Sequence, residues 1–361
     1  FLNYEFPEVR DYVYRIVESF CKNFDVDGIE LDWWRGPRAF PPSWDGEPLH
    51  PYQVEMMNNL MRRIRIMTER IGEERGRPIL LSTRIPMSVE RSLFLGFDLK
   101  TWFDEDLLDL LVLGGGYAPM AMVTNVQEMV AFARPYGAPV YACVSGSAMN
   151  NTGFSGMGHH YFKVEAWRGV AMNMWHAGVD GVYTFNFFPR QNEESVPLYQ
   201  LFDQMGSPET LRGHDKIFAI DRMPIHQLKN KNRWAMVAPD RLPITLGKEG
   251  WTQAKLPVGE DIVANTPAGK TCTATLRIKP TALDESDTFM IRLNGKELGE
   301  AERTEALSDE PGEPDEPWLE MKLDPMLVQE GYNIIEVKLA TQHNPANMPT
   351  IDRFYLTVRY Q

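Results

Sequence analysis

The sequence predicts an α/β protein in which a (β/α)8 TIM barrel is followed by a C-terminal all-β sandwich, and three observations support this fold class. From residue 1 to about residue 212, short apolar runs alternate with longer amphipathic stretches, as in repeated strand–helix units on a parallel sheet. Beyond that point the helical periodicity disappears, and short strands separated by turn residues take over. The length of 361 residues also exceeds that of one ordinary domain. We therefore predict a barrel region over residues 1–212 and a sandwich over residues 213–361.

The elements of the barrel region follow from local patterns. Pro7 stands at the start of a helix predicted over residues 8–23, in which apolar side chains repeat every three or four residues. The apolar side chains of this helix that we expect to face the core are Val9, Tyr12, Val13, Ile16, Val17 and Phe20. The remaining predictions are strands over residues 28–32, 79–83, 110–113, 139–143 and 181–185, and helices over residues 51–74, 99–103, 125–133 and 163–177.

The second region contains five predicted strands, over residues 273–278, 289–293, 318–323, 334–339 and 354–360. Asn294-Gly295 between apolar runs is a strong local signal for a hairpin. Strands at this density are typical of an antiparallel sandwich. An acidic stretch over residues 309–316 lacks the spacing of an EF-hand and is interpreted as a solvated loop.

The composition limits the classes of partner. With 37 Lys and Arg against 50 Asp and Glu, the formal charge is −13, and no basic stripe is present, so neither nucleic acid nor an anionic lipid surface is expected as a partner. No apolar run reaches the roughly 18 residues of a membrane helix. Three widely separated cysteines match no zinc or redox spacing, and we expect no metal and no cofactor. Nine Trp, 13 Tyr and 18 Phe are many for an acidic chain. Most aromatic side chains fill the core, and the others can stack on sugar faces, so the composition is compatible with a carbohydrate ligand.

The most informative residues are Glu30 and Asp32 on the strand over residues 28–32. Side chains alternate along a strand, so both carboxylates share one face and point into the barrel, with Asp32 near the C-terminal mouth where barrel enzymes work. Two acids about 7 Å apart repel each other, which raises one pKa and makes a general acid. Arg84 ends a neighbouring strand at an equivalent height. Alternatively, these three residues form a buried ionic layer that only positions the barrel.

Other strand ends and one long polar loop, over residues 146–162, add residues to the same mouth. Glu165 lies in the first turn of a helix that starts there and is a second candidate general acid, although an acid at that place also fits ordinary helix-dipole stabilisation. Thr184 is expected at the same rim. The candidate substrate-binding residues are Trp34, Arg35, Arg84, Tyr117, Asn150, His160, Tyr161 and Asn186. Adjacent histidines cannot face one metal as an i, i+4 pair does, so sugar contacts are the preferred role of His160.

Two segments carry a resemblance to a known family. Residues 2–12 (LNYEFPEVRDY) and 25–32 (DVDGIELD) resemble the glycosyl-hydrolase-like family 10 group of TIM-barrel proteins, in which an Asn-Pro-x-x-Pro-Glu-Val-Arg helix leads into a strand reading Asp-Val-Asp-Gly-Ile-His-x-Asp-Asp. Residues 165–169 and 177–188 look like relatives from bacteria that degrade complex polysaccharides. The resemblance spans residues 1–220 and implies a barrel, a glycosidase-like role and an extracellular or periplasmic location.

The resemblance has two departures and one further implication. Glu30 replaces the usual His, and Trp33-Trp34-Arg35 removes the acid that follows Asp32 in that group. Trp34 also stands where chitinase-like barrels have their catalytic Glu, which disfavours substrate-assisted chitinolysis. In such barrels this strand is usually the fourth, so strands one to three are expected to be missing, on an N-terminal portion that was removed or on a companion chain that completes the barrel.

The sequence thus predicts a glycoside hydrolase that acts on a poly- or oligosaccharide. Asp32 would be the nucleophile or base, and Glu165 or Glu30 the general acid. One alternative is a non-catalytic carbohydrate-binding barrel protein, because a fold does not determine a function. Another is a polysaccharide lyase, in which His160 or Tyr161 would be the base.

Overall fold

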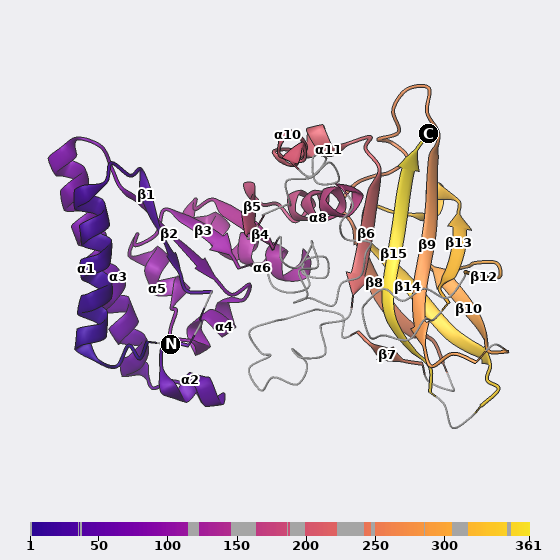
Figure 1. The fold of residues 1–361 in the computed structure, drawn as a ribbon, viewed down its shortest axis with the longest axis horizontal. Helices are drawn as coiled ribbons and strands as arrows, with labels where there is room; N and C mark the ends of the chain where they lie inside the picture. Colours follow the sequence, from indigo (N-terminus) through magenta and orange to yellow (C-terminus); the bar gives the residue numbers. More distant parts are fainter. Residues whose placement is uncertain are drawn as a thin grey trace.

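The computed structural model of the chain describes residues 2–34, 36, 38–114, 123–145, 164–185, 187, 199–221, 242–246, 250–284, 286–304, 317–344 and 348–361. Five parallel strands and their helices form an open β/α half-barrel, and antiparallel sheets follow toward the C-terminus (Figure 1). This arrangement confirms the predicted fold class of a partial barrel followed by an all-β part. The boundary at residue 212 stays a prediction. Within the described ranges, no helix is both long and apolar enough to cross a membrane.

The half-barrel sheet has its strands in chain order. They are β1 (Gly28–Asp32), β2 (Leu80–Ile85), β3 (Leu110–Leu113), β4 (Val140–Ser145) and β5 (Gly181–Phe185). Each strand pairs in parallel with the next, and β1 and β5 are the two edges of this sheet. The bounds of β1, β3 and β5 are those that the sequence predicts, whereas β2 and β4 are shifted by one or two residues toward the C-terminus.

Helices of very different length connect these strands. The long ones are α1 (Pro7–Asn23), α3 (Pro51–Arg75), α6 (Val123–Ala133) and α8 (Val164–His176), and the short ones are α2 (Pro41–Asp45), α4 (Val89–Phe94), α5 (Leu99–Asp104), α10 (Phe202–Met205) and α11 (Pro208–Leu211). The start of α3 is a capping box, in which the backbone N–H groups and side chains of His50 and Gln53 satisfy each other. Gly76, in the left-handed conformation with φ of 73°, ends the same helix.

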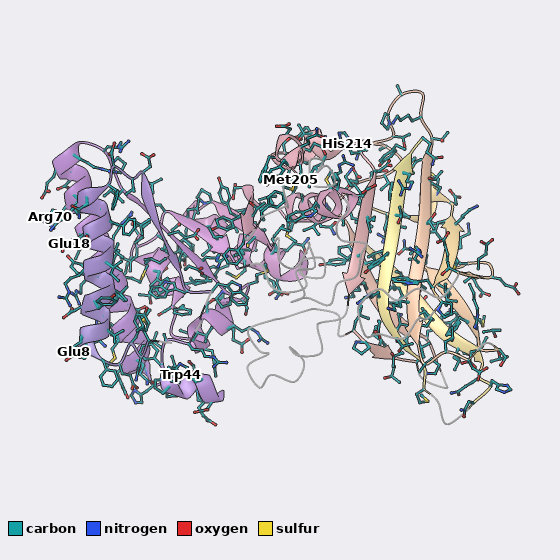
Figure 2. All side chains as sticks on the ribbon, in the orientation of Figure 1. Glu8, Glu18, Trp44, Arg70, Met205 and His214 are labelled. Atoms are coloured by element: carbon teal, nitrogen blue, oxygen red, sulfur yellow. The ribbon has the colours of Figure 1, made fainter. Side chains whose placement is uncertain are left out.

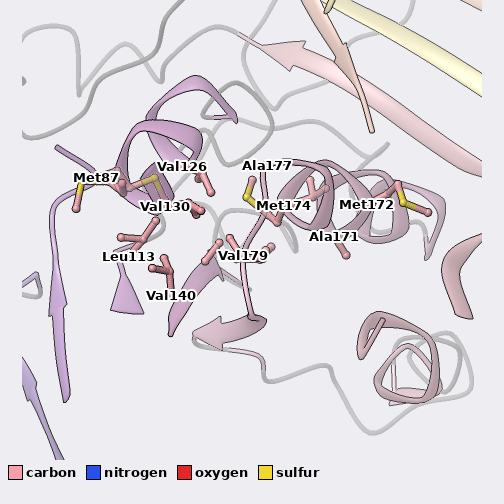
Figure 3. Close-up of a cluster of buried hydrophobic side chains, with 14 of the residues drawn as sticks. Met87, Leu113, Val126, Val130, Val140, Ala171, Met172, Met174, Ala177 and Val179 are labelled. Carbon is pink, nitrogen blue, oxygen red and sulfur yellow. The ribbon is translucent and has the colours of Figure 1, made fainter. Parts of the chain in front are cut away.

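The helices cover one face of the sheet, and this face carries the apolar set of each strand. Leu31, Leu81, Leu111 and Val144 are all buried. Figure 3 shows how the apolar side chains of β3 and β4 gather with those of α6 and α8. The labelled members of that cluster include Leu113, Val126, Val130, Val140, Met174, Ala177 and Val179. Because side chains alternate, the charged residues of β1 and β2 lie on the opposite, inner face, as predicted.

The sheet is strongly curved, and one contact demonstrates the curvature. The hydroxyl of Tyr183 on β5 donates a hydrogen bond of 3.1 Å to Oε1 of Glu30 on β1, the opposite edge. In a flat sheet these edge strands would lie about 19 Å apart, beyond the reach of the two side chains. The five strands therefore bend as part of a barrel wall and bring their inner-face side chains together.

Helix α1 differs from its prediction. Val17 and Cys21 are buried against α3, and the two helices run side by side with Glu18 and Arg70 3.4 Å apart (Figure 2). Tyr12, Ile16 and Phe20, however, are 55%, 44% and 51% exposed, so the prediction that they face the core is wrong. The reason is that β1 is the sheet edge, and no strand–helix unit of the described chain covers this side of α1.

The C-terminal region consists of two antiparallel sheets. Their orders are β11-β10-β14-β8 and β12-β13-β9-β15-β6, with β7 paired to β15. The strands are β6 (Lys216–Asp221), β7 (Ile244–Thr245), β8 (Thr252–Val258), β9 (Cys272–Thr281), β10 (Thr288–Leu293), β11 (Lys296–Glu297), β12 (Glu302–Arg303), β13 (Leu319–Leu323), β14 (Gly331–Thr341) and β15 (Thr350–Tyr360). The predicted hairpin is confirmed, because Asn294 and Gly295 join β10 and β11 with positive φ values of 52° and 80°.

Helix α8 joins the half-barrel to the antiparallel sheets. A Cβ at Gly169 would lie 2.0 Å from the carbonyl oxygen of Ile217 on β6, so helix and strand backbones touch there. One turn later, Nδ2 of Asn173 donates 3.2 Å to the carbonyl of Pro257 on β8. The helix therefore has one face toward the parallel sheet and another on the second region.

Candidate functional site

Charged and aromatic side chains from three strands meet on the inner face of the half-barrel. We call Glu30, Asp32, Arg84, Tyr183 and Phe185 the inner-face cluster. Glu30 and Asp32 come from β1, Arg84 from β2, and the two aromatic residues from β5. Asp32, Arg84 and Phe185 lie at or next to the carboxyl ends of their parallel strands, which is the end where barrel enzymes place their active sites, and Glu30 and Tyr183 lie at the middle of theirs.

Arg84 holds Asp32 in a two-point ion pair. The two residues are direct partners in the sheet register, and Arg84 donates from Nε to Oδ1 at 3.0 Å and from Nη2 to Oδ2 at 2.6 Å. Burial by itself lowers the pKa of the guanidinium, but the hydrogen bonds and charge of Asp32 outweigh it and raise that pKa. The Arg84 side chain is fully buried, whereas that of Asp32 is 34% exposed. The carboxylate is therefore the accessible member of this pair.

Phe185 and Cys143 complete the surroundings of Arg84. The guanidinium carbon lies 3.8 Å from the centroid of the Phe185 ring, which is a cation–π contact. Nη1 of Arg84 lies 4.0 Å from the sulfur of Cys143 on β4. A buried charge needs compensating contacts. The contacts of Arg84 with Asp32, Phe185 and Cys143 join four of the five strands.

Glu30 has a different environment from Asp32. It is exposed by surface area, yet its carboxyl group lies against the hydroxyl of Tyr183. Partial burial raises the pKa of Glu30, and the negative charge of Asp32 adds to the rise, while the Tyr183 hydrogen bond and the Arg84 charge oppose it. Burial and the charge of Glu30 in turn raise the pKa of Tyr183 to about 12. Glu30 is therefore the carboxyl group of the cluster that retains a proton more readily than an ordinary glutamate.

The two carboxyl groups thus combine an ion-paired carboxylate with a neighbour that favours its protonated form. As alternate residues of one strand, Glu30 and Asp32 have Cα atoms about 7 Å apart. Such a pair can donate a proton from one side and accept one, or attack, from the other. The sequence-based prediction that Glu30 and Asp32 share the inner face with Arg84 is confirmed by these contacts.

Trp34 continues the cluster beyond the end of β1. Its backbone N–H donates to Oδ1 of Asp32 at 3.1 Å and to the carbonyl oxygen of Arg84 at 3.0 Å. A Cβ at Gly114, just after β3, would lie 2.4 Å from the indole ring. The absence of a side chain at Gly114 therefore makes room for this ring.

Glu165 makes its contacts elsewhere. Its carboxylate lies 3.9 Å from Arg359 on β15, and Arg359 also pairs with Asp215 at 3.2 Å. This group of charges belongs to the contact between α8 and the antiparallel sheet. Among the described residues, no recorded interaction links Glu165 to the inner-face cluster. Its role as a general acid stays a prediction.

Six of the predicted substrate-binding residues lie outside the described residues. These are Arg35, Tyr117, Asn150, His160, Tyr161 and Asn186. Their roles stay predictions. In the part of the chain that the structure describes, no group of three or more His, Cys, Asp or Glu side chains is placed to hold a metal ion.

Sequence reasoning missed Tyr183 and Phe185. Both contact the inner-face cluster, so alternation along β5 directs Thr184 to the opposite face, and its expected place at the rim is wrong. A signal was present, because Gly181, Tyr183 and Phe185 share one face of a strand whose neighbours were already assigned. Their partners on β1 and β2 could not be deduced without the curvature of the sheet.

The solved structures that the chain resembles include two enzymes, both remote. The chain is similar to the chitinase ChiW from Paenibacillus sp. str. FPU-7, a cell-surface-expressed multi-modular enzyme, with a TM-score of 0.40 and 11% identity over 95% of this chain. It spans 41% of the length of that enzyme. A β-porphyranase of glycoside hydrolase family 86 from the gut bacterium Bacteroides plebeius is matched with a TM-score of 0.21 and 10% identity, over 98% of this chain and 74% of the other.

These identities and TM-scores are too low for a property of either enzyme to be transferred to this chain. No protein-family model matches the sequence. No curated protein matches it either. The resemblance to the glycosyl-hydrolase-like family 10 group therefore depends on the quoted motifs alone.

Proposed function

We propose that this protein is a glycoside hydrolase that cleaves a poly- or oligosaccharide, with Glu30 as general acid and Asp32 as the catalytic carboxylate. The observation that carries the proposal is the pair of carboxyl groups on the inner face of β1, one ion-paired and accessible at the end of the strand, the other with a raised pKa. Glycosidases use two acids in two different environments for this reaction. The resemblance of residues 25–32 to a glycoside-hydrolase-like group supports the same activity.

The proposed reaction assigns each proton. Glu30 donates its proton to the glycosidic oxygen as the bond to the anomeric carbon breaks, and Asp32 accepts a proton from the water that attacks that carbon. Inverting enzymes keep their two carboxyl groups about 6.5–9.5 Å apart, which leaves room for this water, and alternate residues of one strand have Cα atoms about 7 Å apart. Inversion of the anomeric configuration is therefore the proposed outcome.

The remaining predicted residues complete the proposal. Trp34 would stack on a sugar ring, and Arg35, Tyr117, Asn150, His160, Tyr161 and Asn186 would contact hydroxyl groups. Glu165 is the second candidate for the general acid. A polymer-degrading enzyme of this kind would work in an extracellular or periplasmic location.

We further propose that the open side of the half-barrel is covered in the working protein. The edge of β1 and the exposed Tyr12, Ile16 and Phe20 of α1 lie on this side. Unpaired strand edges and contiguous apolar side chains favour association with a further strand–helix unit. This unit would belong to a preceding segment or to a companion chain.

Of the two alternatives, a lyase finds less support in the described residues. The candidate bases of a lyase, His160 and Tyr161, lie outside the described residues. Among the residues of the inner-face cluster, a pKa of about 12 makes the Tyr183 phenolate scarce at neutral pH. A non-catalytic binding protein would use the same inner face of the half-barrel without needing Glu30. Activity measurements separate this alternative from an enzyme.

The test is a hydrolysis screen on a panel of neutral and anionic polysaccharides with matched variants. Glu30→Gln and Asp32→Asn should each reduce the rate by about 10²–10⁴-fold. Asp27→Asn is the control, because Asp27 lies just before the same strand and is 83% exposed. Glu165→Gln decides between the two candidate acids, and nuclear magnetic resonance of the first product reports its anomeric configuration.

Two results would contradict the proposal. Hydrolysis that survives Asp32→Asn unchanged excludes the assigned role of Asp32. Polysaccharide binding in affinity electrophoresis without any product release by the folded protein favours the non-catalytic alternative.

A further inference from the structure

Tyr183 has no role in the proposed reaction, although it contacts the proposed general acid. It lies on β5, 153 residues from Glu30 in sequence, and its hydroxyl reaches across the curved sheet to Oε1 of Glu30. On the same strand, Phe185 supports the guanidinium of Arg84, which holds Asp32. Strand β5 therefore contacts Glu30 directly through Tyr183, and contacts the cation that holds Asp32 through Phe185.

We propose that Tyr183 is a positioning residue that stabilises the Glu30 carboxylate formed when Glu30 gives up its proton. This inference depends on the proposed role of Glu30 as general acid. The phenolic O–H donates to the carboxyl oxygen, and a donor of this kind interacts more strongly with an ionised acceptor than with a neutral one. The interaction therefore grows as the proton leaves, which is the condition for lowering a barrier.

The groups that face Glu30 determine in which direction its pKa moves when the Tyr183 hydroxyl is removed. On its own strand it meets Asp32, from β2 the Arg84 guanidinium, and from β5 the Tyr183 hydroxyl. Cys143 on β4 acts on Arg84 and Tyr183. Burial and Asp32 raise the pKa of Glu30, and Tyr183 and Arg84 lower it. Loss of the tyrosine hydroxyl removes one of the two opposing contributions, so the pKa of Glu30 must rise further.

The rise in the pKa of Glu30 determines how the pH dependence of the rate changes. A general acid is active while protonated, so the rate falls as the pH rises through its pKa. In Tyr183→Phe this alkaline limb should move to higher pH, because Glu30 keeps its proton longer. The maximal rate should fall by about tenfold, the value of one hydrogen bond of about 1.4 kcal/mol, while KM stays unchanged.

The decisive experiment measures the pKa of Glu30 directly. Carboxyl-carbon magnetic resonance follows the titration of Glu30 in the wild-type chain and in Tyr183→Phe, with Glu30→Gln identifying the signal. Tyr141→Phe is the matched control, because Tyr141 lies on the neighbouring strand β4 and its ring packs on Gly181. The pKa of Glu30 should rise in Tyr183→Phe and stay the same in Tyr141→Phe.

A reciprocal measurement on the pKa of Tyr183 keeps the inference testable if Tyr183→Phe does not fold. Linkage requires that Glu30→Gln lower the pKa of Tyr183 below about 12, which ring-carbon resonances of labelled tyrosine report. An unchanged or lowered pKa of Glu30 in folded Tyr183→Phe overturns the inference, as does an unchanged Tyr183 in Glu30→Gln. If both pKa values move as expected but no polysaccharide is hydrolysed, the proposed function fails and the coupling of the two residues stands.

Discussion

Two buried cations, one in each region, show how exposure separates a candidate reactive group from a structural one. Arg84 in the half-barrel and Lys216 on β6 are both fully buried, and each pairs with a carboxylate, Asp32 at 2.6 Å and Glu260 at 2.8 Å. The Asp32 side chain is 34% exposed, whereas that of Glu260 is 2% exposed. A carboxylate that solvent reaches can meet a substrate, and a sealed one can only hold the fold together.

Further hydrogen bonds compensate the buried charge of Lys216 in the sealed Lys216–Glu260 pair. Nζ of Lys216 also donates to the carbonyl oxygens of Leu211 and His214, at 2.6 and 3.0 Å. Burial lowers the pKa of Lys216 and raises that of Glu260, and each charge partly offsets the effect on the other. The difference teaches that the register of two strands on the inner face of the half-barrel can present an ion pair to solvent, whereas the segment that follows β8 buries its carboxylate against β6.

The largest expected effect is the loss of one partner of the sealed pair. Glu260→Gln leaves the Lys216 charge buried and should lower the free energy of unfolding by about 3–5 kcal/mol. Urea denaturation followed by circular dichroism measures this. Replacing both residues, as Lys216→Met with Glu260→Leu, should restore most of the loss, because no buried charge remains.

The control for this prediction is a pair that solvent reaches. Glu320 is 35% exposed and pairs with Arg277 at 3.2 Å, so Glu320→Gln should cost less than about 1 kcal/mol. Equal losses in Glu260→Gln and Glu320→Gln would break the comparison between sealed and accessible pairs.

A smaller effect tests whether the two regions unfold together. Ala at Gly169 would place its Cβ 2.0 Å from the backbone of β6, and we expect Gly169→Ala to destabilise the chain by about 1–3 kcal/mol. Gly206→Ala is the control, because a Cβ there meets nothing within 4 Å and φ is −69°. Calorimetry should show one transition that shifts to lower temperature in Gly169→Ala only. Two separate transitions in the wild type would mean that α8 does not couple the regions.

The smallest effect contrasts the two sides of α1. Val17 is 6% exposed, and Val17→Ala should cost about 1.5 kcal/mol for the two buried carbons that it removes. Ile16, 44% exposed, should tolerate Ser with a change within about 0.5 kcal/mol. Urea denaturation of the isolated chain measures both. A larger loss in Ile16→Ser than in Val17→Ala would show that the exposed side is covered in solution.

Much of the half-barrel was predictable because its strands are short and locally patterned. Alternation along β1 placed Glu30 and Asp32 on one face, and the equivalent height of β2 identified Arg84 as their cation. The hairpin at Asn294-Gly295 was predictable for the same reason, since two adjacent residues determine it. In the second region, β6 and β8 were missed, although they form the contact with α8.

The sequence by itself determined the period of each element, and with it the faces on which the carboxylates and the apolar side chains lie. Only the tertiary structure decided that Tyr183 reaches Glu30, that Glu165 meets Arg359, and that one side of α1 is left open. The physical reason is that a period describes neighbours along the chain. These contacts instead depend on how far a sheet curves and where it ends, which are properties of all its strands together.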